Sequence, residues 1–312
     1  MKIKTWRDPY EAGFSPTKPT EIELQPGLTV LVGCNGAGKS TLLRNIEEHC
    51  KSNKISCHLY DNLKSGGFSS ISSLMFEGDY GEASYLFCAS EGEGIKANVQ
   101  RESTMYKGFF ENGYMNNSKN RMARIFADED KLKELDLQYA TCKDRILLFD
   151  AVDSGLSVDS IVEVKKMFDS IIEDTKNMNL NIYIIIAANE YELARHSNCF
   201  DVNDGKYITF NDYEEYRSFI IKNRIAKEKR IEKQISWRNN KKQKEIEKYI
   251  KYRKSIEQKR ITLQTKKDSG KRLNWNEEYT LDHIDSVIRD FVRDLRFVNE
   301  EELNKIWKET QE

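Results

Sequence analysis

The sequence predicts an α/β fold over its first two thirds, followed by an all-helical basic extension. Short apolar runs alternate with helix-like stretches up to about residue 210, which is typical of a mostly parallel sheet covered by helices on both faces. After Asn211 the composition changes, because residues 213–268 contain no Gly or Pro and are rich in Lys, Glu, Arg, Gln and Ile. We therefore expect two domains, residues 1–212 and residues 213–312.

Unbroken apolar runs predict the strands of the first domain, and the stretches between them predict its helices. Residues 199–210 predict a hairpin that turns at Asp204-Gly205. The expected strands are 21–24, 28–32, 55–59, 145–150 and 181–187. The expected helices are 39–50, most of 95–140 with breaks near residues 112–113 and 116–117, and 160–172.

The second domain is expected to begin with one long helix, residues 213–268, of about 80 Å. Its isoleucines do not keep a strict heptad, so a long two-stranded coiled coil is only weakly supported. Ser269-Gly270 should end this helix, and two shorter helices are expected at residues 280–296 and 299–310. The first of these has an apolar face at helical spacing. That face consists of Ile284, Val287, Ile288, Phe291 and Leu295.

The net charge of −1 conceals a strong asymmetry along the chain. Residues 222–272 hold 20 Lys and Arg against 6 Asp and Glu, a surplus of +14, so the remainder carries −15. Charge sorted in this way is typical of a protein with a polyanionic partner or of a long solvated helix.

Composition also restricts the compartment and the kind of site. No run of about 18 apolar residues exists, which argues against a membrane protein. The first ten residues lack the apolar region of a secretory signal, so we expect a cytoplasmic protein. The six cysteines form no CxxC pair, which favours reduced thiols over a zinc site.

Residues 33–40 match the phosphate-binding pattern GxxxxGK(S/T) in full, between a predicted strand and a predicted helix. Backbone amides of such a loop turn toward the phosphates, and the helix N-terminus adds partial positive charge. Lys39 should reach the β- and γ-phosphates of ATP, and Ser40 should hold Mg²⁺. The loop consists of Gly33, Cys34, Asn35, Gly36, Ala37, Gly38, Lys39 and Ser40.

The strand predicted at residues 145–150 is apolar until its last residue, Asp150. A buried strand that carries one aspartate at its carboxyl end commonly completes the Mg²⁺ shell of such a loop. We therefore predict Ser40 and Asp150 as the metal-binding residues.

With both motifs placed, the chain resembles the ABC ATPase superfamily, and within it the head domains of SMC-type, RecF-like and OLD-like DNA-maintenance ATPases. Residues 33–41 (GCNGAGKST) are similar to their GxNGxGKST string, and residues 149–157 (FDAVDSGLS) to their DEPxSGLS segment. The start of the chain, with MKI, Arg7 and EIEL at residues 21–24, is similar too. The resemblance covers about residues 1–210.

This resemblance implies an ATPase that uses ATP and Mg²⁺ and forms a dimer around two ATP molecules. It adds Thr41 and Arg7 to the ATP-binding residues and places a D-loop at Ser154 and Gly155. Small heads of this kind also resemble phage-encoded or antiviral defence ATPases. The phosphate loop of one copy would face the signature motif of the other copy.

Two positions depart from the family's catalytic pattern. Ala151 stands where the family has the glutamate that polarises the attacking water, and loss of such a base costs about 10²–10⁴-fold in rate. Ala151 is either natural, in a degenerate ATPase, or an engineered replacement that traps ATP; the intact motif around it favours the second explanation. Asn189 stands at the position of the switch histidine.

The signature motif is also imperfect. Our candidate is Ser90 with Gly92 and Glu93, because a helix-like stretch follows them. The segment 65–67 (SGG) is more similar in letters but comes too soon after the phosphate loop, and it stays open as the alternative. No glutamine lies between Ser40 and Gln100, so the loop that couples ABC transporter subunits to their channels is not visible.

The basic stretch 222–272 interleaves cations with Trp237, Tyr249 and Tyr252. Cations neutralise phosphates and aromatic rings stack on exposed bases, so nucleic acid is one expected ligand. A solvated helix, an acidic partner protein and docking onto the chain's own acidic part are the alternatives. The binding residues we select are Lys241, Lys242 and Lys244.

Three functions follow from these patterns. The first is an ATP-driven dimeric clamp that acts on nucleic acid or a partner protein. The second is a non-hydrolysing ATP-binding scaffold that recruits an effector protein. The third is the nucleotide-binding subunit of a transporter, against which the missing glutamine and the basic helix argue.

Overall fold

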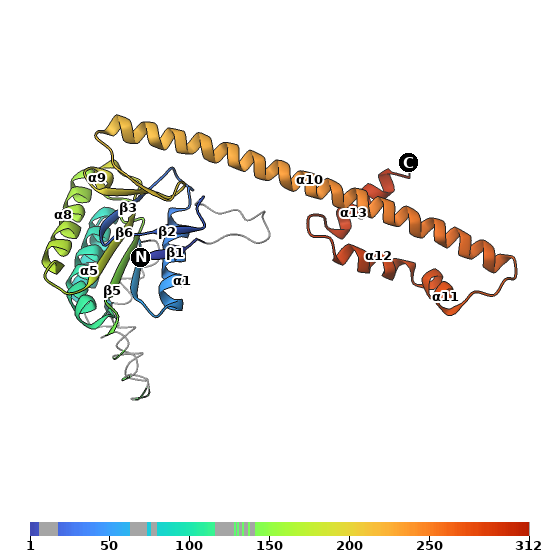
Figure 1. The fold of residues 1–312 in the computed structure, drawn as a ribbon, viewed down its shortest axis with the longest axis horizontal. Helices are drawn as coiled ribbons and strands as arrows, with labels where there is room; N and C mark the ends of the chain where they lie inside the picture. Colours follow the sequence, from blue (N-terminus) through green and yellow to red (C-terminus); the bar gives the residue numbers. More distant parts are fainter. Residues whose placement is uncertain are drawn as a thin grey trace. The chain divides into compact units, whose positions relative to one another are not determined.

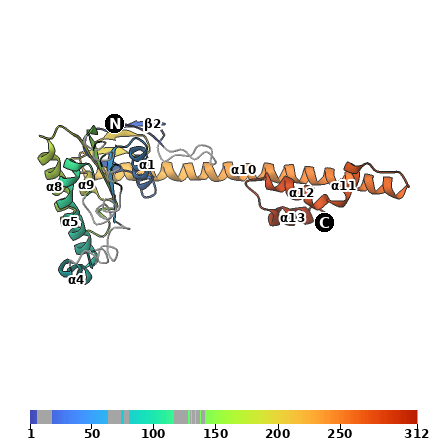
Figure 2. The same cartoon turned by 90° about the horizontal axis from the view of Figure 1, so that it is seen from below.

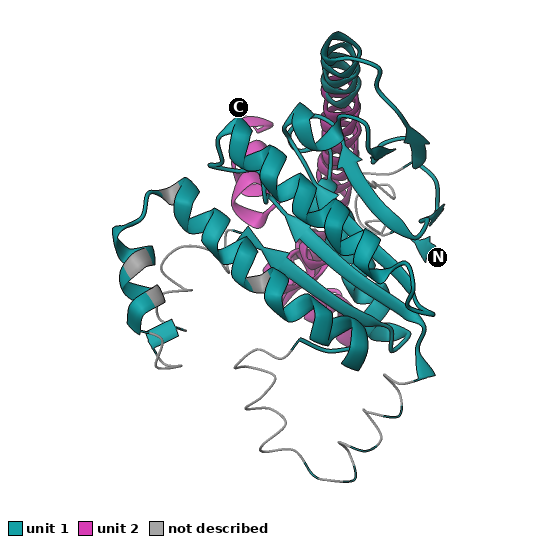
Figure 3. Ribbon diagram, turned by 90° about the vertical axis from the view of Figure 1, so that its left-hand side faces the viewer, with its two compact units in different colours: residues 1–227 teal, residues 228–312 magenta. Residues whose placement is uncertain are grey.

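The computed structural model describes residues 1–5, 18–62, 74–75, 80–115, 128, 130, 133, 137 and 141–311, with backbone alone at 82, 85, 91 and 102. The chain forms two compact units, Met1–Lys227 and Glu228–Glu312 (Figure 3). The boundary falls after Lys227 and not after residue 212, because the beginning of the long helix packs with the first unit.

Unit 1 is built on a six-stranded sheet, counted over the described residues, with the strand order β4-β5-β6-β3-β7-β8. All its pairings are parallel except β7 with β8. A separate antiparallel pair is formed by β1 (Lys2–Lys4) and β2 (Glu21–Glu23). The strands of the sheet are β3 (Gly27–Val32), β4 (Ser56–Asp61), β5 (Asp144–Asp150), β6 (Asn181–Ala187), β7 (Asn198–Asp201) and β8 (Lys206–Ile208).

Helices cover both faces of this sheet (Figure 1). Successive strand residues point to opposite faces, and β5 illustrates the result. Leu147 and Phe149 enter the core cluster formed with α5 and α8, whereas Ile146 and Leu148 enter the cluster formed with α1. The described helices of this unit are α1 (Lys39–Ser52), α4 (Tyr80–Cys88), α5 (Glu91–Asn112), α8 (Val158–Thr175) and α9 (Tyr191–Ala194). The predicted α/β fold class is thereby confirmed.

Two elements of unit 1 differ from the sequence expectation. Helix α4 covers residues 80–88 and is not among the helices expected from the sequence. Helix α5 begins at residue 91 because Ser90 and Glu93 form a reciprocal capping box, in which each side chain binds the other residue's backbone amide. It ends at Asn112, where Gly113 adopts φ +80° in the left-handed region.

Helix α10 (Tyr213–Asp268) is continuous and contributes to both units. Three helices follow it where two were expected: α11 (Trp275–Asp282), α12 (Ile284–Arg293) and α13 (Glu300–Glu309). The expected helix 280–296 was wrong at its start, because Asn274 forms a capping box that begins α11 and His283 separates α11 from α12. The helical character of the C-terminal region is confirmed.

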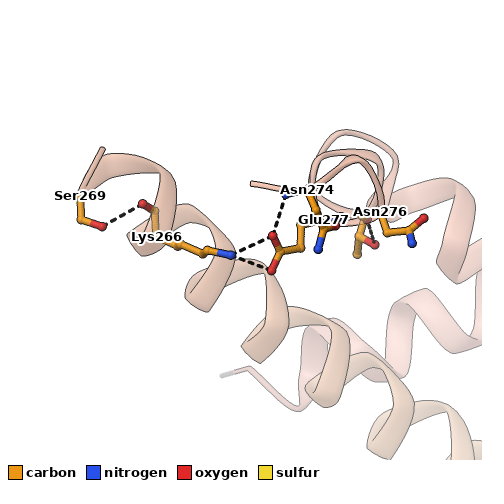
Figure 4. Close-up of polar contacts among 6 residues, drawn as sticks. Lys266, Ser269, Asn274, Asn276 and Glu277 are labelled. Atoms are coloured by element: carbon orange, nitrogen blue, oxygen red, sulfur yellow. Dashed lines mark hydrogen bonds and ion pairs between the residues drawn. The ribbon is translucent and has the colours of Figure 1, made fainter. Parts of the chain in front are cut away.

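Unit 2 has a core of its own. Tyr249 of α10 is fully buried against the apolar faces of α12 and α13, including Ile288 and Leu303. The turn from α10 into α11 is held by the Lys266 ammonium, which donates to both carboxylate oxygens of Glu277 at 2.8 and 2.9 Å (Figure 4). That hydrogen bond is the main reason that the pKa of Glu277 lies below its usual value.

Within the described parts of both units, no helix combines the length and the hydropathy of a membrane span.

Candidate functional site

The predicted phosphate loop connects β3 to α1 at the carboxyl edge of the sheet. Gly36 and Gly38 adopt φ of +70° and +101°, values that strain any residue with a Cβ. Gly38 is the N-cap of α1, so the unpaired amides of the first helical turn face the loop. The Ala37 amide donates to the Cys34 carbonyl at 2.9 Å and closes the turn. This backbone is shaped to bind an anion.

Lys39 lies inside this loop. Its ammonium donates to the Gly33 carbonyl at 2.8 Å, and the residue is only 8% exposed. Burial lowers the pKa of Lys39, while the carboxylates of Asp153 and Asp150 act in the opposite direction. A buried ammonium group at the mouth of an anion-binding loop is well placed to contact phosphate oxygens.

Ser40 and Asp150 meet across the site, because the Ser40 hydroxyl donates to a carboxylate oxygen of Asp150 at 2.8 Å. Burial raises the pKa of Asp150, which the Ser40 hydrogen bond opposes and the neighbouring carboxylate of Asp61 reinforces. A hydroxyl and a carboxylate are ligands that suit Mg²⁺, which takes its other ligands from water and phosphate. The residues present therefore fit a magnesium ion bound together with a nucleotide.

These groups line one pocket of about 460 Å³. The pocket collects the ends of three neighbouring parallel strands, since Asp150 ends β5, Ala187 ends β6 and the loop follows β3. The expected catalytic positions Ala151 and Asn189 lie in the same lining. The complete lining is Asn35, Gly36, Gly38, Lys39, Ser40, Thr41, Asp150, Ala151, Ala187 and Asn189.

Ala151 adopts φ +54°, an uncommon conformation for a residue with a side chain. Its carbonyl accepts a hydrogen bond from the Asn62 side chain at 3.1 Å, which connects the ends of β4 and β5. The methyl group can neither accept a proton nor orient a water molecule. In this chain the position therefore supplies no general base.

The loop containing Asn189 is held by Asp153. One carboxylate oxygen of Asp153 accepts hydrogen bonds from the amides of Asn189 at 2.5 Å and Glu190 at 2.8 Å. Asp153 is 3% exposed, and its other oxygen has no hydrogen-bond partner among the described residues. The Asn189 carbonyl in turn accepts from the Tyr216 hydroxyl at 2.8 Å.

The expected signature and D-loop residues lie next to each other but outside the pocket lining. A Cβ added to Gly92 would lie 2.8 Å from the Gly155 carbonyl oxygen, too close for any residue but glycine without a backbone shift. Ser90 is exposed and its hydroxyl donates to Glu93 at 2.8 Å, which is a local cap. Ser154 donates its amide to the Ala151 carbonyl at 3.1 Å.

Two sets of predicted residues lie outside the described part of the chain. Arg7 is one, and the alternative signature segment 65–67 is the other.

The three basic residues selected on α10 lie in unit 2, far from the pocket residues in sequence. Lys241 is exposed with its ammonium 5.6 Å from the Trp237 ring centroid, and Lys244 is exposed. Lys242 forms an ion pair with Glu302 of α13 at 2.6 Å. For Tyr249 the expectation of a ring free to stack on bases was wrong, because this side chain is buried in the unit's core. The other two rings pack on phenylalanines, Tyr252 on Phe291 and Trp237 on Phe297.

Several residues around the pocket were missed by sequence reasoning. Asp61 lies opposite Asp150 in the register of β4 and β5. If the expected strand 55–59 had been extended by two residues, Asp61 would have been placed at the same edge of the sheet as Asp150. Tyr216 and Lys227 gave no such signal, because they lie in a helix whose composition marks it only as basic.

Among solved structures, the chain is similar to cbiO1 from Clostridium perfringens, part of the cbiONQ ABC transporter complex. The sequence identity is 15% and the TM-score 0.36, over 66% of this chain and 86% of that chain. It is also similar to an ATP-binding cassette of an ABC transporter in its ADP conformation, at 12% identity and a TM-score of 0.34, over 72% of this chain and 99% of that one.

A third similar structure is a dimeric ATP-binding cassette in a post-hydrolysis state bound to ADP and Pi, at 14% identity and a TM-score of 0.34, over 68% and 100% of the two chains. No protein-family model matches the chain, and no curated protein matches it in sequence. Similarities this low carry no functional conclusion.

Proposed function

We propose that this chain binds Mg²⁺–ATP in the 460 Å³ pocket and acts as an ABC-type ATPase. The observation that carries the proposal is the convergence of the phosphate loop, the Lys39 ammonium and the Ser40–Asp150 pair, whose oxygens are 2.8 Å apart. The loop amides and Lys39 would bind the phosphates, with Thr41 and Arg7 as further ATP-binding residues. Bound Mg²⁺ would neutralise charge on the transferring phosphoryl group.

Titration of the full chain with a fluorescent ATP analogue tests this proposal. We expect saturable binding that weakens when EDTA removes Mg²⁺, and that ATP and ADP displace but AMP does not, because the loop recognises the β- and γ-phosphates. Absence of binding at millimolar ATP would overturn the assignment.

Two copies of the chain would enclose two ATP molecules, with Ser90, Gly92 and Glu93 of one copy facing the phosphates bound by the other. Support comes from the chemistry of the Ser90 segment, where an exposed hydroxyl stands at the N-terminus of the 22-residue helix α5. Helix N-termini favour anions. The D-loop residues Ser154 and Gly155 would lie beside this contact, since Gly92 and Gly155 are already neighbours.

Replacing Ser90 with arginine should prevent the ATP-induced dimer while leaving ATP binding within about twofold. The bulky side chain would obstruct the close approach of a second copy, and Ser90 lies outside the pocket lining. Size-exclusion chromatography with light scattering, with and without ATP, measures the effect. Ser84→Arg, at an exposed serine on α4, is the matched control. An ATP-dependent dimer that persists in Ser90→Arg would show that the signature lies elsewhere, with Ser65 the next candidate.

We further propose that the C-terminal unit binds nucleic acid or an acidic protein, in a role similar to that of SMC-, RecF- or OLD-like ATPases, including antiviral defence. The +14 surplus of residues 222–272 supports a polyanionic partner. Because Tyr249 is buried and Trp237 and Tyr252 pack on phenylalanines, we expect phosphate contacts, which position a protein on nucleic acid without reading its sequence.

If about five phosphates are neutralised, the logarithm of the affinity should fall against the logarithm of salt concentration with a slope of about −4.5. Lys241→Glu combined with Lys244→Glu should weaken binding and flatten this slope, as measured by fluorescence anisotropy. Lys242 is left intact because reversing it would oppose Glu302. No binding to duplex, single-stranded DNA or RNA at about 50 mM salt would leave an acidic protein as the partner class.

A non-hydrolysing scaffold that recruits an effector protein is the second candidate, and the alanine at position 151 favours it. The residue at this position in the native gene distinguishes the two. Glutamate would indicate an enzyme, and alanine would indicate a scaffold.

A further inference from the structure

The first four turns of α10, residues 213–227, which we call the α10 root, belong to unit 1. Three polar side chains of the root contact three different loops of unit 1, two of which line the pocket. They are Tyr216, Asn223 and Lys227, whose spacing of seven and four residues places them on one face of the helix. The root is therefore part of the packed structure of unit 1 as well as the beginning of the long basic helix.

Two of these residues fix the register of the root. Tyr216 is 5% exposed, packs edge-on against Phe210 at 5.2 Å and donates to the carbonyl of Asn189, which lines the pocket. Asn223 is 8% exposed and its side-chain oxygen accepts a hydrogen bond from the Asn203 amide group. Asn203 lies in the loop that follows β7. Because both contacts are buried, they determine where the next turn of the helix lies.

The third residue reaches the phosphate loop itself. The Lys227 ammonium donates to the carbonyl of Asn35 at 2.9 Å. It lies so close to Gly36 that an added Cβ there would collide with it. Its charge also acts on Lys39, where it adds to the lowering of that residue's pKa. Two ammonium groups therefore donate hydrogen bonds to carbonyls of the same loop. Lys39 belongs to the loop itself, and Lys227 belongs to α10.

Each of two neighbouring ammonium groups disfavours the charged form of the other. A multiply charged anion bound beside them stabilises the charged form of both. The hydrogen bond to Asn35 also fixes a carbonyl in the middle of the loop, which orients the amides on either side. A lysine in this place thus increases the positive potential at the loop and holds the loop's shape.

We propose that Lys227 is a positioning residue of the nucleotide site, supplied by the α10 root, and that it increases the preference of the loop for ATP over ADP. The proposal rests on the proposed function, because it assumes that the pocket binds ATP. The extra negative charge of the third phosphate is the source of the preference, since a cation attracts the more highly charged ligand more strongly.

Affinities of the full chain for fluorescent ATP and ADP, measured with Mg²⁺ at about 50 and 300 mM salt, test this inference. Lys227→Gln should weaken ATP binding by about tenfold and ADP binding by clearly less, so that the ATP/ADP ratio falls. Lys227→Arg should restore most of the ratio. Because exposed charges are screened by salt, the difference from wild type should shrink at the higher concentration.

Lys222→Gln is the matched control, since Lys222 is an exposed lysine on the same root. It should leave both affinities and the ratio unchanged. A purely structural role for Lys227 would lower both affinities equally, together with the melting temperature. An unchanged ATP/ADP ratio in folded Lys227→Gln overturns the inference while leaving the proposed function standing. Wild-type protein that binds neither nucleotide overturns both.

Discussion

Replacing Lys39 with alanine should weaken ATP binding at least about 100-fold. The Lys39 ammonium lies within the phosphate loop, 2.8 Å from the Gly33 carbonyl, and is the buried cation of the pocket lining. A hydrogen bond to a charged group contributes about 1.5–3 kcal/mol, and Lys39 is placed to make such bonds with two phosphate groups. Losing both corresponds to two orders of magnitude or more in affinity.

Equilibrium titration with a fluorescent ATP analogue measures this loss. Lys51→Ala is the control, because Lys51 is an exposed lysine in the last turn of the same helix. Near-wild-type affinity is expected for the control, and a circular dichroism spectrum should confirm that both variants are folded. If Lys39→Ala binds ATP as the wild type does, the nucleotide lies in another place and the proposed function fails.

Replacing Ala151 with glutamate should increase ATP turnover at least about tenfold. Position 151 directly follows Asp150 and lines the same pocket, so a carboxylate there would stand beside the phosphates and could polarise the attacking water. A positioned base contributes about 10²–10⁴-fold. Part of this gain would be offset, because the new carboxylate lies close to Asp150 and Asp61, whose negative charges disfavour a third.

Phosphate release at saturating ATP measures turnover independently of affinity, which the added charge will change. Ala151→Gln is the matched control, since it has nearly the same size but no basic oxygen, and its turnover should stay at the wild-type level. Equal turnover in the glutamate and glutamine variants would assign the base to another residue, with Asp153 the first to test, or would mark the chain as a binding protein.

The parts of the site that sequence could predict are contiguous in the chain. The loop from Gly33 to Ser40 contains its own glycines, its lysine and its helix start, so its chemistry follows from local spacing. Asp150 could also be placed, because an apolar strand ending in a carboxylate is a local pattern. The sheet could be predicted from runs such as residues 182–187, which are buried on both faces.

The parts that sequence could not predict depend on contacts between distant segments. Tyr216 binds the carbonyl of Asn189, which is 27 residues away, and Lys227 binds Asn35, which is 192 residues away. Both acceptors are backbone carbonyls, so the residue types at Asn189 and Asn35 give no indication of the contact in the sequence. Tyr249 was assigned to a nucleic-acid surface because its neighbours are charged, yet its burial against α12 and α13 is decided by helices that lie further along the chain.

Helix α10 continues from unit 1 into unit 2 without a break, and this restricts which truncated forms of the protein can be informative. A deletion of residues 213–312, designed to remove only the arm, would also remove Tyr216 and Asn223 from unit 1 and expose Phe210, which packs on Tyr216, to water. A cut between Lys227 and Glu228 would sever a hydrogen-bonded helix and leave up to four carbonyls and four amides without partners. Loss of activity after either truncation would therefore indicate damage to the proposed nucleotide site as much as loss of a partner. A genetic test of the arm should therefore keep the chain at full length and change its exposed lysines.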